Sequence, residues 1–109
     1  MTYVKINNTL YPAQISGKLR DYEWNDRASK TITLEMEYAT AIALFVDDLE
    51  WSIYDDGIYD NVTSESEEFD NSEYCIAGDV TDHRDGTVSV KMGMPTDGEI
   101  LAIITGGAI

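Results

Sequence analysis

Apolar side chains at every second position are the feature that most restricts how this chain folds. In KTITLEME (residues 30–37) and TVSVKMG (residues 87–93) they alternate with polar side chains, which is typical of a strand with one buried face. The pair Asp85-Gly86 directly before the second segment favours a tight turn, so we expect a hairpin over residues 73–93. The side chains predicted to face inward from 30–37 and 87–93 are Ile32, Leu34, Met36, Val88, Val90 and Met92.

Weaker alternation predicts three further strands, at residues 2–7, 10–22 and 49–54. Asn7 and Asn8 close the first strand with residues that favour turns, and the second strand returns from that turn. Because Pro12 has no backbone N–H to donate, it predicts that the second strand lies at a sheet edge or contains a bulge.

The segments between the strands predict one loop and two helices. Residues 22–29 are polar and predict a loop that Trp24 anchors. Residues 38–47 lack alternation and are rich in Ala, so we expect a short helix there, with an apolar face of Ile42, Phe45 and Val46. Thr96 followed by Glu99 is a capping box, which predicts a second short helix over TDGEILAII that stops at the Gly-Gly pair behind it.

Together these elements predict a single α+β domain over residues 1–109. The architecture that we expect is a small antiparallel β-sheet, a sandwich or a partly open barrel, with two short helices. A chain of this length can bury a real but modest core. Beyond the 73–93 hairpin, the pattern does not indicate which strands pair.

Acidic residues are concentrated in one part of the chain. The formal net charge is −14, and the 52 residues from 31 to 82 contain 15 of the 21 acidic side chains and no Lys or Arg. Within that tract, YDDGIYDNVTSESEEFDN (residues 54–71) carries seven carboxylates, and we expect an acidic hairpin loop or insertion at about residues 55–71. Such a surface repels phosphate, so we expect no direct binding to nucleic acid or membrane; basic proteins and cations are the natural partners.

The residue types give little support to catalysis or to a metal site. A calcium site needs six to eight oxygen ligands from a turn, and neither Asp55-Asp56-Gly57 nor the acids near Asp85 have the spacing of an EF-hand loop. Zinc needs several Cys or His ligands, and the chain has one of each, Cys75 and His83. A nucleophilic pair of Cys75 and His83 across the predicted hairpin has no other support in the sequence. We expect no enzymatic activity, no metal, no cofactor and no small-molecule ligand.

The sequence also bears on location. No apolar run reaches the roughly 20 residues that span a bilayer. The opening MTYVKINNTLYP lacks the basic start and apolar core of a signal peptide, and a lone Cys forms no internal disulfide. We therefore expect a reducing cytoplasm.

Two long segments carry a resemblance. KTITLEMEYATAIALFVDDLEWSI (residues 30–53) and FDNSEYCIAGDVTDHRDGTVSVKMGMPT (residues 69–96), together with the ending ILAIITGGAI, resemble small prophage-encoded proteins of Gram-positive gut bacteria. The match covers most of the chain, and residues 55–68 are where we expect variation. The resemblance implies a phage origin and the cytoplasm of a bacterial host.

For a phage protein of this charge, the resemblance implies one of three functions. The first is inhibition of a host defence system, which is the function of the anti-CRISPR proteins. Basic channels bind DNA in RNA-guided type II nucleases, and a dense array of carboxylates can compete for such a channel as a DNA mimic. The second possible function is that of a structural or assembly protein of the virion, near the tail. The third is that of a binding domain for another basic host protein. The partner-binding residues that we expect under the first are Tyr54, Asp55, Asp56, Tyr59, Asp60, Glu65, Glu67, Glu68, Phe69, Asp70 and Glu73.

Overall fold

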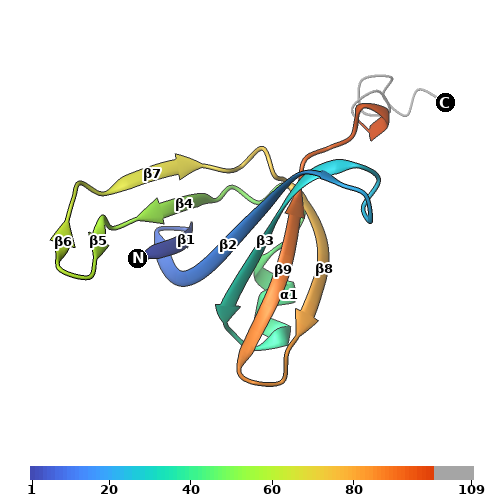
Figure 1. The fold of residues 1–109 in the computed structure, drawn as a ribbon. Coiled ribbons are helices and arrows are strands. Elements are labelled where there is room, and N and C mark those ends of the chain that lie inside the picture. Colours follow the sequence, from blue (N-terminus) through green and yellow to red (C-terminus); the bar gives the residue numbers. More distant parts are fainter. Residues whose placement is uncertain (100–109) are drawn as a thin grey trace.

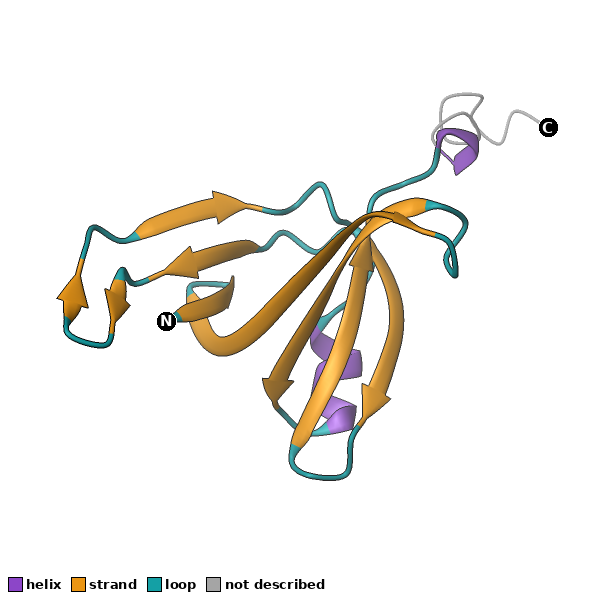
Figure 2. Cartoon of the chain, viewed as in Figure 1, coloured by secondary structure: helices purple, strands orange, loops and turns teal. Residues whose placement is uncertain are grey.

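A computed structural model of the chain describes residues 1–99 and consists mainly of antiparallel strands (Figure 1). Its elements are β1 (Thr2–Ile6), β2 (Thr9–Asp21), β3 (Arg27–Glu35), α1 (Tyr38–Leu44), β4 (Ser52–Asp55), β5 (Ile58–Tyr59), β6 (Val62–Thr63), β7 (Glu67–Asp70), β8 (Ile76–Asp82) and β9 (Thr87–Gly93). A further helical turn begins at Asp97 and is visible in Figure 2 beyond the loop that follows β9.

Seven of the strands form one sheet in the order β7-β4-β1-β2-β3-β9-β8, and β5 and β6 form a separate small sheet. Every pair in both sheets is antiparallel, and β7 and β8 remain edges, so the large sheet is not closed into a barrel. The predicted α+β class with an antiparallel sheet is confirmed. The predicted β8–β9 hairpin is present, with Asp82 opposite Val88 and with Gly86 at φ +91° in the turn.

The long strand β2 connects the two halves of the sheet. Its first residues pair with β1, from Thr9 opposite Ile6 to Pro12 opposite Tyr3, and its later residues pair with β3 from Ala13 onward. β2 has β1 and β3 as neighbours, but Pro12 itself pairs with Tyr3 of β1 alone, so the strand is open on its other side there, as the Pro predicts. Pro12 is tolerated because the pairing with β3 begins one residue later, where a backbone N–H is present. The bulge lies elsewhere, between Lys18 and Asp21.

The core confirms the predicted alternation. Ile32 and Leu34 of β3 face Val90 and Val88 of β9 in the ladder, and all four side chains are buried. α1 covers this face of the sheet (Figure 1). The rest of the buried apolar core is Val4, Ile6, Ala41, Phe45, Trp51 and Met92.

α1 is shorter than predicted and presents a different face. Ala41 and Phe45 are buried, whereas Ile42 is 45% exposed and Val46 46% exposed. The prediction that Ile42 and Val46 face the core is therefore wrong, and only Phe45 of the predicted face does so. The helix ends at Leu44 and packs against β8 and β9, with Ala41 and Phe45 in the core.

The opposite face of the sheet is closed by the turn between β2 and β3. Trp24 lies against Gly78 and Gly93, where an added Cβ would come within 2.6 Å and 2.8 Å of its indole ring. Arg27 stacks on that ring at 4.6 Å and forms two hydrogen bonds with Glu99. The predicted anchoring role of Trp24 is confirmed, although the loop is shorter than expected since β3 already begins at Arg27.

A buried ion pair lies on this same face. Asp21 is 1% exposed and accepts hydrogen bonds from Lys91 Nζ at 2.9 Å and from Ser29 Oγ at 3.0 Å. The hydrogen bond from Lys91 is the main reason that the pKa of Asp21 lies below its usual range. At the end of the described chain, Thr96 and Glu99 cap each other as predicted, and the rest of the predicted second helix lies outside the described residues.

Candidate functional site

The acidic segment forms a β-hairpin arm, which we define as residues 52–70. β4 pairs with β1 at one end of the main sheet, β5 and β6 make a small hairpin beyond the end of β4, and β7 returns to pair with β4 as the edge strand. Figure 1 shows this arm pointing away from α1 and from the β8–β9 hairpin, and the described chain is 57 Å long but only 33 Å by 27 Å across. The predicted hairpin at about residues 55–71 is therefore present as an ordered β-structure.

The ladder register distributes the predicted residues over two faces of the arm. Residues directly opposite each other in an antiparallel pair point to the same face, and neighbours along a strand alternate. Asp55 lies opposite Glu67 on one face, and Tyr54 lies opposite Glu68 on the other. Phe69 shares the face of Glu67, and Asp70 shares that of Glu68. The carboxylates therefore do not form a single array.

At the bend after β4, two of the predicted carboxylates are used to hold the arm together. Asp55 accepts hydrogen bonds from the Tyr59 hydroxyl at 2.5 Å and the Gly57 N–H at 2.8 Å. Asp56 accepts from the Met1 amino group at 2.7 Å, from the Ile58 N–H and from the hydroxyl of Tyr3. The pKa of Asp55 is lowered chiefly by Tyr59 and that of Asp56 chiefly by the amino group, so both stay ionised in mildly acidic solution.

Two further predicted carboxylates have partners near the base of the arm. Glu68 forms an ion pair with Lys5 of β1 at 2.9 Å, which lowers the pKa of Glu68. Asp70 accepts hydrogen bonds from the Ser72 hydroxyl at 2.6 Å and from the Ser72 N–H, and the hydroxyl is the first cause of its lowered pKa. Lys5 therefore neutralises part of the charge on this face, a role that the sequence did not indicate because Lys5 is 63 residues from its partner.

The other predicted carboxylates remain available at the surface. The side-chain carboxylates of Asp60, Glu65 and Glu67 are exposed and make no hydrogen bond or ion pair within residues 1–99. Asp60 lies in the turn between β5 and β6, at φ +51°. Glu73, just beyond the arm, is also exposed; burial lowers the pKa of Lys30, and the charge of Glu73 offsets part of that effect.

The aromatic residues predicted beside the acids have three different environments. Tyr54 is half-buried and packs against Tyr3 with ring centroids 6.0 Å apart. Tyr59 is held by Asp55, and Phe69 on the edge strand β7 is 52% exposed. The tip of the arm also exposes two apolar side chains, those of Ile58 and Val62.

Ile58 and Val62 were missed from the sequence. The signal that points to them is the apolar alternation on either side of Asp60 and Asn61, which form the turn of the small hairpin. In the part of the chain that the structure describes, no three His, Cys, Asp or Glu side chains come together to hold a metal ion.

Comparison with known protein families, with characterised proteins and with solved structures found no match to this chain. Among the helices of residues 1–99, none is long and apolar enough to cross a membrane.

Proposed function

We propose that this protein is a non-enzymatic, phage-encoded inhibitor that binds a basic, nucleic-acid-binding defence protein of the host. An RNA-guided type II nuclease is the target class that we favour, with the acidic arm occupying part of its DNA-binding channel. The observation that carries the proposal is that the arm, residues 52–70, forms the outer edge of the sheet and extends beyond it at the β5–β6 tip, with seven acidic side chains and no Lys or Arg.

Electrostatics favours this kind of partner. DNA presents one negative charge per roughly 1.7 Å of its axis, and the channels that bind it are rich in Lys and Arg. A projecting acidic hairpin is attracted over a distance into such a channel and releases counterions when it docks. Because Asp56 and Glu68 are already paired within the chain, the contacts with the partner come mainly from Asp60, Glu65 and Glu67.

The test is a cleavage assay with a guide-loaded type II nuclease. The purified protein is added before or after the target DNA, at low and at high salt. We expect inhibition only when the protein is added first, and we expect it to fade at high salt. Inhibition that does not depend on the order of addition would place the site outside the DNA channel, and no inhibition of several such nucleases would refute this target class.

A matched pair of variants separates the contribution of the arm carboxylates to binding from the contribution of the net charge. The variant D60N/E65Q/E67Q removes the three free carboxylates, and Asn tolerates the positive φ of residue 60. The control E23Q/E35Q/E37Q removes the same charge from exposed residues away from the arm. An exposed charge pair is worth about 1 kcal/mol at contact distance in water, so we expect the arm variant to weaken binding by at least about tenfold. Equal loss in both variants would mean that only net charge matters.

A second candidate is a structural or assembly protein of the phage virion. The observation in its favour is that the arm also carries exposed apolar side chains, with Ile58 53%, Val62 67% and Phe69 52% exposed. Such residues suit permanent contacts between subunits. This candidate predicts that the arm carboxylate variant has little effect, whereas I58S/V62S prevents incorporation of the chain into particles.

A further inference from the structure

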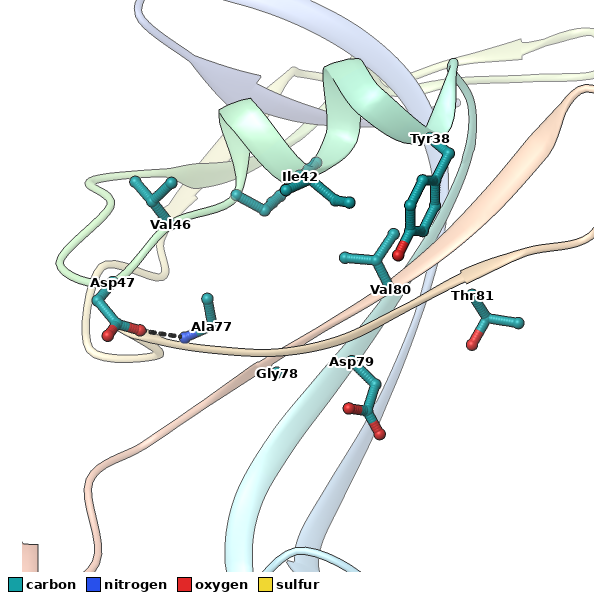
Figure 3. Close-up of a pocket in the computed structure, with 10 residues that line it drawn as sticks. Tyr38, Ile42, Val46, Asp47, Ala77, Gly78, Asp79, Val80 and Thr81 are labelled. Atoms are coloured by element: carbon teal, nitrogen blue, oxygen red, sulfur yellow. Dashed lines mark hydrogen bonds between the residues drawn. The ribbon is translucent and has the colours of Figure 1, made fainter.

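A groove on the far side of the molecule from the arm runs between α1 and the edge strand β8 (Figure 3). Its volume is about 710 Å³, and its lining comes from α1, from the residues that follow α1, and from β8. This groove belongs to neither the arm nor the face that Trp24 covers. It combines a sheet edge with an exposed apolar helix face.

The edge of β8 is open along part of its length. β8 has β9 as a neighbour on one side and no strand of the described chain on the other. Its first residues are already paired by the segment after α1: Asp48 N–H donates to Cys75 O at 2.8 Å, and Ala77 N–H donates to Asp47 Oδ1 at 2.8 Å (Figure 3). These bonds end at Ala77, so the edge from Gly78 to Asp82 is left for an additional strand.

The helix presents an apolar stripe to this edge. Tyr38 and Ile42 lie four residues apart on α1 and Val46 follows just after the helix, and their side chains are 45%, 45% and 46% exposed. Figure 3 shows Val80 of β8 pointing from the strand toward Tyr38. A strand added beside β8 would place every second side chain against this stripe, as in domains that recognise extended peptides between a strand and a helix.

The charge of the groove walls indicates which charge the side chains of an added strand would have. The groove is lined by Asp47 and Asp79 and by no Lys or Arg, since both walls belong to the tract from 31 to 82 that lacks basic residues. A second copy of this chain would bring the same carboxylates face to face, at a formal net charge of −14 for each copy. Charge complementarity therefore favours a basic partner.

We propose that the groove between α1 and β8 binds an extended segment of a partner protein that alternates apolar and basic residues. The segment adds to β8 along Gly78–Asp82 and buries its apolar side chains against Tyr38, Ile42 and Val46. Its Lys or Arg side chains face Asp79. This inference does not rest on the function proposed for the arm.

The test uses the full chain and a short synthetic peptide of alternating valine and lysine, followed by ¹⁵N and methyl NMR. We expect shift changes at Gly78–Asp82 and at the methyl groups of Ile42 and Val46. Replacing lysine by glutamate in the peptide should weaken binding by at least about tenfold. Two peptides N-methylated on opposite sets of alternate residues should differ, because only one set of N–H groups pairs with the edge.

Variants of single sites show whether a change in peptide binding comes from the groove, from a loss of folding or from the arm. Ile42→Ser changes an exposed side chain of the groove and should weaken the peptide by several-fold, whereas Leu19→Ser, 94% exposed and outside the groove, should not. The arm variant D60N/E65Q/E67Q should bind the peptide as the wild type does. Shift changes confined to the arm, or equal binding of the lysine and glutamate peptides, would overturn the proposal. Self-association of the free protein that Ile42→Ser abolishes would also overturn it, because the occupant would then be a second copy.

Discussion

Gly78→Ala tests the close packing of Trp24 against the sheet. Gly78 lies in β8, and a Cβ built there would lie 2.6, 2.9 and 3.0 Å from three carbon atoms of the Trp24 indole. Real Cβ atoms do not approach carbon atoms this closely, so the ring has to move. The ring is held on its other side by Arg27, which itself is fixed by two hydrogen bonds to Glu99.

The cost can be worked from these contacts. Forcing a methyl group into a packed site costs about 1–3 kcal/mol, and replacing Gly by Ala returns about 0.4–1 kcal/mol through the unfolded chain. We therefore expect Gly78→Ala to lower the free energy of unfolding by about 1–2 kcal/mol and the melting temperature by roughly 5–15 °C. Gly17→Ala is the control: the nearest atoms lie 3.8 and 3.9 Å from its Cβ, so its stability should be unchanged or slightly higher.

Urea denaturation of a double-mutant cycle decides whether Trp24 is the obstacle. Trp24→Ala alone should cost about 2 kcal/mol, since the ring is half-buried and loses the stacking with Arg27. In that background Gly78→Ala should cost nothing, which gives a coupling energy of about 1–2 kcal/mol. If the two changes are additive, the ring does not restrict residue 78 and the reasoning fails.

Two further predictions concern acid and the core. The lowered pKa of Asp21 means that its contribution to stability is complete above the unfolded-state pKa, near 3.9, and is lost as the pH falls through the lower folded-state value. Thermal unfolding scans from neutral to strongly acidic pH should show a fall in melting temperature that Asp21→Asn reduces, and an unchanged slope in the variant would refute the link. Met92→Ala removes a fully buried side chain and should cost about 2–5 kcal/mol in urea denaturation, whereas Leu19→Ala should cost less than about 0.5 kcal/mol.

Much of the fold could be predicted from local patterns. The alternation in β3 and β9 predicted which of their side chains are buried, because a strand that covers a core on one face alternates with period two. The turns at Asn7-Asn8 and Gly86 were also predicted. These residues have positive φ angles in the structure, and Asn and Gly adopt such angles more readily than other residues do. α1 was placed correctly at its start, but its buried face was not, because that face depends on the sheet against which the helix packs.

The candidate site could be predicted only in part. The composition of residues 54–71 indicated an acidic hairpin, and the structure contains one. The roles of the single carboxylates were not predictable, because Asp56 and Glu68 are paired by groups 55 and 63 residues away along the chain. The small hairpin at the tip depends on contacts between strands of two residues each, which are too short to give a clear pattern.

The sequence by itself determined the class of the fold, the core faces of the strands and the concentration of charge between residues 31 and 82. These properties depend on residue type and on spacing along the chain. Only the tertiary structure decided that β7 and β8 are the edges, that the carboxylates divide between two faces of the arm, and that the apolar residues of α1 line a groove. The reason is that strand order and helix docking depend on contacts between residues distant in sequence, which alternation and composition do not record.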